Sequence, residues 1–125
     1  MREKKWGRVV NITSTASRQP IHGLTLSNSF RPGLLGLAKT VADEVGADGV
    51  LINTVMPGIT MTARMTELAE KGESTLIERL RSQTPLKRAA EPYELGSTVA
   101  WLCSNTCSFI TGSAIAVDGG SIRCI

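Results

Sequence analysis

Apolar runs that alternate with amphipathic segments are the feature that most limits how this chain can fold. Three short runs are rich in β-branched residues and do not alternate with charges, which predicts strands buried on both faces. These runs are residues 7–14, 49–58 and 110–120. Apolar residues at helical spacing predict helices at residues 31–46, 60–72, 74–83 and 91–104. This order predicts an α/β fold with about three parallel strands and flanking helices.

The predicted sheet is small. With 125 residues the chain is long enough for one domain, and no repeat or linker marks a second. Parallel sheets are normally covered on both faces, and their lateral strands are normally paired or protected. We therefore expect three strands to be one side of a larger structure.

Charge and composition argue against several classes of function. The formal net charge is +3, and basic residues cluster within residues 2–8 and 79–88. Aromatic residues make up 4% of the chain, so we interpret both clusters as solvated surface and expect no nucleic-acid partner. No apolar run approaches about 20 residues, so we expect no membrane span. The N-terminus lacks the apolar region of a signal peptide.

The cysteines and the single histidine do not suggest a metal site. Cys103, Cys107 and Cys124 are odd in number and contain no C-x-x-C pair. His22 completes no usual zinc spacing with them. We expect no metal, and a reducing, cytoplasmic setting.

Three segments in a consistent order resemble the C-terminal half of the short-chain dehydrogenase/reductase family. The run "GRVVNITS" resembles the strand that carries the family's catalytic serine, and "INTVMPGITMT" resembles its N-x-x-x-P-G-x-x-x-T segment. Residues 85–120 resemble its closing helix, loop and last strand. The resemblance covers residues 7–120 and implies a partial Rossmann-like, three-layer fold.

The resemblance also implies what the chain acts on. The expected activity is NAD- or NADP-dependent reduction of a carbonyl or oxidation of an alcohol on a small molecule, of the 3-oxoacyl-reductase type. The expected assembly of a full-length protein is a homodimer or homotetramer. The family's phosphate-binding glycine loop has no match here, so we expect residues 1–125 to be a single partial domain without the N-terminal cofactor-binding half. We expect the isolated chain to bind dinucleotide weakly and to be inactive.

The catalytic positions implied by the resemblance are Ser14, Ser27 and Arg31. Ser14 matches the family serine that orients the substrate carbonyl, although its hydroxyl could equally bond to backbone at the strand end. Ser27 and Arg31 stand four residues apart where the family has tyrosine and lysine. A phenol has a reference pKa of about 10, whereas an aliphatic hydroxyl is a far weaker acid. Arginine keeps its charge and could bind ribose hydroxyls, but it cannot shuttle protons.

The residues that the resemblance assigns to the cofactor are Arg31, Pro57, Gly58, Ile59 and Thr62. The turn at residues 57–59 would contact the nicotinamide carboxamide through its backbone, and Thr62 would contact the carboxamide or a phosphate through its hydroxyl. Met56, Met61 and Met65 flank this turn. Methionines adapt to irregular apolar ligands, so they fit an acyl substrate as well as ordinary packing.

Two other side chains are candidates for the missing acid. His22 lies in the loop between Ser14 and Ser27 and titrates nearest to neutral pH, although a lone loop histidine is usually surface. Tyr93, the one tyrosine, stands at the start of a distant helix, where we interpret it as packing or capping.

The position of Pro32 indicates where the first predicted helix begins. Pro32 has no N–H and is tolerated only in the first turn of a helix. Ser29 as N-cap would make it the third helical residue, so we expect Ser27 to lie before the helix and any contact between Ser27 and Arg31 to be looser than in a helical pair. Gly46 is expected to cap the far end in a left-handed conformation.

A function of a different class also fits the sequence. A catalytically inactive member of the same fold could persist as an oligomerisation or interaction module, because an exposed first strand and apolar faces favour pairing with another chain. The segments expected to form that contact are residues 31–46 and 114–120.

Overall fold

The three predicted strands form one parallel sheet. The computed structural model describes residues 1–124, with the side chains of residues 68, 73, 74 and 76 outside that description. The strands are β1 (Gly7–Ile12), β2 (Val50–Pro57) and β3 (Ala114–Val117), in the order β1-β2-β3. Both pairings are parallel, with Gly7 opposite Val50 and Thr54 opposite Ala114. The predicted α/β class with about three parallel strands is therefore confirmed.

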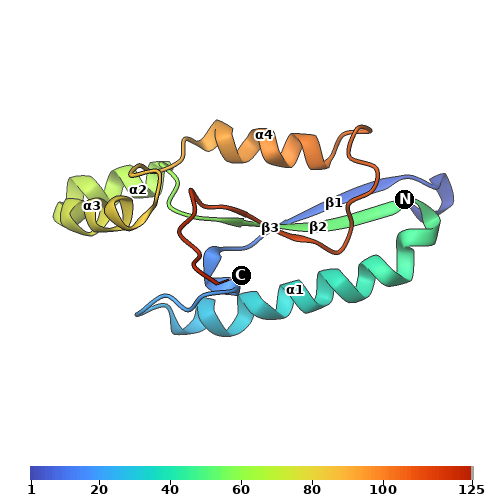
Figure 1. Cartoon of the computed structure of the whole chain (residues 1–125), viewed down its shortest axis with the longest axis horizontal. Coiled ribbons are helices and arrows are strands. Elements are labelled where there is room, and N and C mark those ends of the chain that lie inside the picture. The colour runs from blue at the N-terminus through green and yellow to red at the C-terminus, as the bar shows by residue number, and fades with distance from the viewer. Residues whose placement is uncertain (125) are drawn as a thin grey trace.

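Helices cover both faces of the sheet and make three layers (Figure 1). Helix α1 (Thr25–Val45) lies on one face, where Ala38 and Ala42 pack against Val50 and Ile52 of β2. Helix α4 (Pro92–Leu102) lies on the other, where Leu102 packs with Val55 and Cys107. Helices α2 (Ala63–Leu68) and α3 (Ser74–Gln83) lie beyond the carboxyl ends of the strands. These two helices therefore lie next to the carboxyl ends of the strands and do not form a layer on either face of the sheet.

The remaining elements are short turns of helix. Single 3₁₀ turns form at Arg2–Lys4, Thr15–Ser17 and Gly46–Asp48. The predicted helix at residues 60–72 is shorter than expected, because α2 passes into a π turn at Ala69–Glu73 and Gly72 adopts a φ of 93°. Within the described residues, no helix is both long and apolar enough to cross a membrane.

The prediction for the start of α1 is wrong. The helix begins at Thr25 and runs through Ser27, Arg31 and Pro32 without a side-chain N-cap. Pro32 therefore lies in the second turn or beyond, where its missing N–H leaves the carbonyl of residue 28 without its helical partner. Side-chain contacts to the preceding loop, described below, hold the early turns in place, and such contacts outweigh local propensity.

The predicted glycine cap at the end of α1 is also wrong. Gly46 is right-handed, with φ −58° and ψ −43°, and leads into the following 3₁₀ turn. Gly49 instead adopts the left-handed conformation, with φ 71°. A Cβ atom at Gly49 would collide with the carbonyl of Lys5, so only glycine fits this close approach to the start of β1.

Candidate functional site

A cleft of about 1000 Å³ opens at the carboxyl ends of the strands. In open parallel sheets this is where ligands are usually bound. Its walls are residues 12–15 after β1, the loop at residues 19–24, the turn at residues 57–62 after β2, part of α3, and the C-terminal segment at residues 121–123. The fold therefore brings together segments that are more than 100 residues apart in the sequence.

Six of the seven residues predicted for the site line this cleft. They are Ser14, Arg31, Pro57, Gly58, Ile59 and Thr62. Ser27 is not among the lining residues, although Arg31, which does line the cleft, is bonded to it. His22 also lines the cleft, so the structure places a titratable group there that sequence reasoning could only mention as an alternative.

Ser14 makes the backbone hydrogen bond that the sequence allowed, and it also lines the cleft. It has extended backbone and caps the 3₁₀ turn at Thr15–Ser17, with its Oγ accepting a hydrogen bond of 3.1 Å from the Ala16 N–H. This bond uses a lone pair and leaves the hydroxyl hydrogen available to a second partner. Ser14 is thus fixed by backbone while it faces the cleft.

Ser27 and Arg31 form a close helical pair, so the expectation of a loose contact is wrong. Arg31 Nε donates to Ser27 Oγ at 2.8 Å across one turn of α1. Arg31 Nη1 also donates to the carbonyl of Thr13 at 2.6 Å. Thr13 in turn donates to the Val55 carbonyl through its N–H and its hydroxyl, at 2.9 and 3.2 Å. Hydrogen bonds from a charged group are stronger than neutral ones, so this chain of contacts ties α1 to β1 and β2 beside the cleft.

Asn28 is a residue that sequence reasoning missed. Its side-chain oxygen accepts from the Ile21 N–H at 3.0 Å, and its amide nitrogen donates to the Ile21 carbonyl at 2.8 Å. This pair of bonds holds the loop that carries His22 against the first turns of α1. Local sequence did not indicate this contact, because the partner of Asn28 lies seven residues earlier in a loop.

The turn at residues 57–62 is held by backbone on two sides. Gly58 N–H donates to the Val117 carbonyl at 3.0 Å, and a Cβ at Gly58 would lie 2.7 Å from the Asp118 Cα. On the other side, the Ala90 N–H donates to Ile59 and the Ala90 carbonyl accepts from Met61, at 2.9 and 2.8 Å. The turn is thus locked, and only glycine fits where it meets the end of β3.

Thr62 stands at the N-terminus of α2 with its hydroxyl uncommitted. It occupies the N-cap position with extended backbone, but its side chain makes no capping hydrogen bond. Thr60 differs, because its hydroxyl donates back to the Gly58 carbonyl at 3.3 Å. Of the two threonines, Thr62 is therefore the one free to bond to a ligand.

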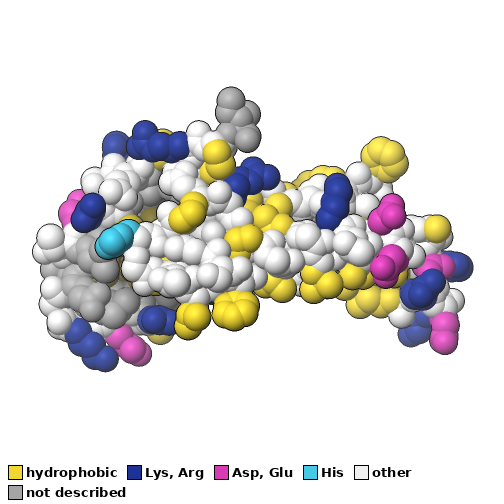
Figure 2. Space-filling view, turned by 90° about the horizontal axis from the view of Figure 1, so that it is seen from below, with side chains coloured by type: hydrophobic (Ala, Val, Ile, Leu, Met, Phe, Trp, Pro, Cys, Tyr) yellow, Lys and Arg dark blue, Asp and Glu magenta, His cyan; other side chains and the backbone are white. Residues whose placement is uncertain are grey.

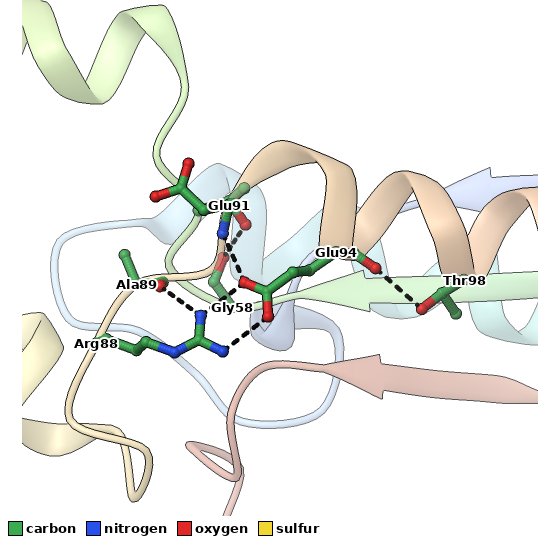
Figure 3. Close-up of polar contacts among 7 residues, drawn as sticks. Gly58, Arg88, Ala89, Glu91, Glu94 and Thr98 are labelled. Carbon is green, nitrogen blue, oxygen red and sulfur yellow. Dashed lines mark hydrogen bonds and ion pairs between the residues drawn. The ribbon is translucent and has the colours of Figure 1, made fainter.

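An ion-pair network at the start of α4 supports this turn (Figure 3). Arg88 donates to both carboxylate oxygens of Glu94 at 2.6 and 2.7 Å, and Glu94 also accepts from the Glu91 N–H at 2.8 Å. The guanidinium of Arg88 and then the Glu91 backbone N–H lower the pKa of Glu94 to about 2. The same pairing raises the pKa of Arg88. Pro92 at the first turn indicates this helix start in the sequence, and the structure adds a capping box formed by Glu91 and Glu94.

Asp118 holds the C-terminal wall of the cleft. Its carboxylate accepts from the N–H groups of Gly120 and Ile122 and from the Ser121 hydroxyl, at 2.9, 2.7 and 3.1 Å. The Arg123 N–H donates to the side chain of Gln19 at 3.0 Å, which joins the two ends of the chain across the cleft. The contact between Arg123 and Gln19 spans 104 residues, so it could not be predicted from local sequence.

The three methionines that flank the turn lie in different surroundings. Met56 is fully buried in the core, Met65 lines the cleft, and Met61 accepts a weak hydrogen bond from Arg81 beside a smaller cavity. The prediction that Tyr93 packs is wrong, because 71% of this residue is exposed. Among the described residues, no group of three or more His, Cys, Asp or Glu is arranged to bind a metal.

A three-layer parallel sheet with a cleft at the carboxyl ends of its strands is the architecture of doubly wound α/β proteins. Residues 1–121 match the family described as enoyl-(acyl carrier protein) reductase, a short-chain dehydrogenase/reductase family. The chain therefore belongs to the short-chain dehydrogenases/reductases and corresponds to their C-terminal region.

Individual relatives agree with this assignment. The acetoacetyl-CoA reductase of Rhizobium meliloti is 37% identical over 120 residues, which are 96% of this chain and 48% of that protein. The 3-oxoacyl-(acyl-carrier-protein) reductase of Aquifex aeolicus is 35% identical over 120 residues, 96% of this chain and 47% of that protein. The chain thus spans about half the length of the curated relatives it matches.

A solved structure extends the similarity to the fold. L-sorbose reductase from Gluconobacter frateurii, solved with NADPH and L-sorbose, superposes with a TM-score of 0.94 at 27% identity. The superposition covers 100% of this chain and 51% of that one. The predicted partial Rossmann-like fold is therefore confirmed.

Proposed function

We propose that this chain is the C-terminal part of an NAD(P)-dependent oxidoreductase that reduces a carbonyl or oxidises an alcohol, of the 3-oxoacyl-reductase type. One observation carries the proposal: six residues that match the family's catalytic and cofactor positions, from three segments of the chain, line a single cleft. The relatives named as acetoacetyl-CoA and 3-oxoacyl reductases support the substrate type. Small carbonyl compounds are the proposed substrates.

Ser14, Ser27 and Arg31 are the proposed catalytic residues. The hydroxyl hydrogen of Ser14 would be donated to the substrate carbonyl, since its lone pair is already bonded to Ala16. Arg31 would place positive charge where the substrate oxygen becomes negative, and Ser27 would position Arg31 through its 2.8 Å contact. Neither the serine hydroxyls nor the Arg31 guanidinium is a competent general acid. Because such an acid typically contributes about 10²–10⁴-fold to the rate, we expect the whole reductase to turn over slowly or not at all, and the isolated chain to be inactive.

The residues present fit the nicotinamide end of a dinucleotide. The close approach of Gly58 to Asp118 fixes the turn whose backbone would contact the carboxamide, and the Thr62 hydroxyl is uncommitted. Pro57 and Ile59 would complete that contact, and Arg31 would bind ribose hydroxyls. When bound, the nicotinamide supplies or accepts the hydride. The residues that read the ribose 2′ position would belong to the N-terminal half of the family fold, so NAD and NADP are both proposed as cofactors.

Calorimetric titration with NADPH and NADH tests the proposal directly. Tryptophan fluorescence is a poor reporter here, because Trp6 bonds to Asn105 beyond the amino ends of the strands, away from the cleft. We expect weak, saturable binding that Arg31→Met reduces. Arg18→Met is the matched control, since Arg18 is exposed and does not line the cleft. Equal binding by both variants would refute the assignment of Arg31, and micromolar affinity would overturn our expectation for the isolated chain.

A second candidate is an inactive chain that acts as an interaction module. A row of apolar residues on α1 supports it: Leu26, Phe30, Leu34 and Leu37 are exposed at helical spacing. Figure 2, which views the α1 side, shows hydrophobic side chains gathered along this face. The outer edge of β1 is also unpaired among the described residues. A homodimer or homotetramer through α1 and β3 is the proposed assembly.

Sedimentation velocity separates the two candidates. For the module, Leu26→Ser with Phe30→Ser should convert dimers or tetramers to monomers, while Lys39→Ser on α1 should have no effect. A monomeric parent chain that binds NADPH would exclude the module and favour the oxidoreductase. A reducing, cytoplasmic setting stays a prediction from the three free cysteines.

A further inference from the structure

Among the residues that the structure describes, the charged side chains that line the cleft are all basic. They are Arg31, Arg79 and Arg123, which line it together with His22. The three arginines come from three separate elements: α1, α3 and the C-terminal segment. A chain with a net charge of only +3 therefore concentrates three guanidinium groups around one opening.

These guanidinium groups are not neutralised by carboxylates. Among the described residues, no ion pair involves Arg31, Arg79 or Arg123. The nearby acids are occupied elsewhere: Glu78 pairs with Arg81 at 3.8 Å, and Asp118 accepts hydrogen bonds from its own turn. A cleft lined by one sign of charge attracts ligands of the opposite sign.

The backbone that carries Arg123 is fixed from two sides. Asp118 accepts from the N–H of Ile122, and Gln19 accepts from the N–H of Arg123 at 3.0 Å. The adjoining wall is apolar, with Leu80, Met65 and Ile122 beside the two outer arginines. The cleft therefore pairs a cationic rim with an apolar lining.

We propose that Arg79 and Arg123 form an anion-recognising subsite, so that the carbonyl substrate carries its own carboxylate or phosphate group. This inference rests on the proposed oxidoreductase function and narrows its substrate class. Arg31 is held by Ser27 and Thr13 in the proposed catalytic group, whereas Arg79 and Arg123 are exposed and would select the substrate. Arginine suits this role because its planar fork of donors matches carboxylate and phosphate oxygens.

Binding of matched probes to the 125-residue chain tests the subsite without any need for turnover. Acetoacetate carries the carboxylate, methyl acetoacetate has the same carbonyl without the charge, and inorganic phosphate distinguishes a phosphate preference. Each is titrated by NMR while the side-chain N–H signals of arginine are followed. We expect acetoacetate or phosphate to shift the Arg79 and Arg123 signals, and the ester to bind roughly tenfold more weakly or not at all.

Variants make the result specific. Arg79→Gln and Arg123→Gln should each weaken binding of the preferred anion roughly tenfold. Arg64→Gln removes the same charge from α2, outside the cleft lining, and should change binding less than about twofold. If neither acetoacetate nor phosphate binds more tightly than the ester, or if all three variants lose binding equally, the subsite is overturned.

The two proposals fail in different ways. If NADPH binds in an Arg31-dependent manner but neither acetoacetate nor phosphate binds more tightly than the ester, the oxidoreductase proposal stands and the anion subsite is wrong. If the anions bind through Arg79 and Arg123 but NADPH does not bind at all, the subsite stands as an anion site and its link to a reductase is wrong.

Discussion

β1 and β2 are neighbours with similarly apolar sequences, yet they are packed very differently. Five consecutive residues of β2, 52–56, are buried. In β1 only Gly7 is buried, and Ile12 is 49% exposed. The prediction of burial on both faces is thus confirmed for β2 and wrong for β1. The cause is position, because β2 has a strand on each side and β1 has one.

The same contrast extends into the cleft. The turn after β2 is fixed by backbone hydrogen bonds to Val117 and Ala90. The wall after β1 depends instead on side chains, namely Arg31 on the Thr13 carbonyl and Asn28 on Ile21. We therefore expect the β2 side to be the rigid half of the site and the β1 side to be the half that substitution can reshape.

Truncation of matched residues on the two strands should give the largest difference. Met56→Ala on β2 removes a fully buried side chain and should lower the free energy of unfolding by about 2–5 kcal/mol. Ile12→Ala on β1 removes a half-exposed one and should cost less than about 1 kcal/mol. Urea denaturation measures both. Similar losses in the two variants would mean that β1 is as well packed in solution as β2.

Alanine substitution of one glycine in each region compares the stability of the rigid turn after β2 with that of α1. Gly58→Ala places a Cβ 2.7 Å from the Asp118 Cα, so it should destabilise by about 1–3 kcal/mol as neighbouring backbone shifts. Gly36→Ala meets nothing within 4 Å on α1 and should stabilise by about 0.5–1 kcal/mol through helix propensity. Thermal unfolding of the pair checks the signs. A neutral Gly58→Ala would show that the turn is mobile.

Substitution of Pro32 tests how strongly side-chain contacts hold the start of α1, on the β1 side of the cleft. If α1 begins at Thr25, Pro32→Ala restores the bond to the residue 28 carbonyl and should stabilise by about 1–2 kcal/mol, after the lost chain restriction is subtracted. If the helix began at Ser29 in solution, Pro32 would cost no bond and the substitution would be neutral or slightly destabilising. Urea denaturation together with the amide signals of residues 25–31 decides between the two starts.

The sequence predicted the parts of the fold whose signals are local. Parallel strands, α4 and the turn at residues 57–62 follow from apolar runs, from Pro92 and from the Pro57-Gly58 pair. Their partners lie close in sequence or are backbone groups that any residue supplies. The same reasoning placed Ser14 and Thr62 at one cleft through the family pattern.

The parts that could not be predicted depend on distant side chains. The start of α1 is set by Asn28 and Arg31, whose partners Ile21 and Thr13 are 7 and 18 residues away. Arg123 reaches the cleft because Gln19, 104 residues earlier, binds its backbone. A rule for proline in a helix considers only the lost bond, and here other contacts outweigh it. Apolar composition likewise could not reveal that β1 stands at an edge.

The smallest expected effect concerns two exposed ion-pair clusters. One lies at the start of α4, and the other lies ahead of β2. Arg88 depresses the pKa of Glu94 to about 2 at the start of α4, and Lys5 and then Arg2 lower the pKa of Asp48 ahead of β2. A depressed carboxylate pKa stabilises the folded state above the ordinary value, and that stabilisation is lost as pH falls toward the folded pKa. The difference in Tm between the parent and Glu94→Gln should therefore hold from pH 7 to about 4.5 and shrink toward pH 2. Glu44→Gln, on exposed α1 surface, should show no such window. A Tm difference that stays constant with pH would mean that Glu94 acts through shape or capping, and that charge does not help hold the turn beside β2.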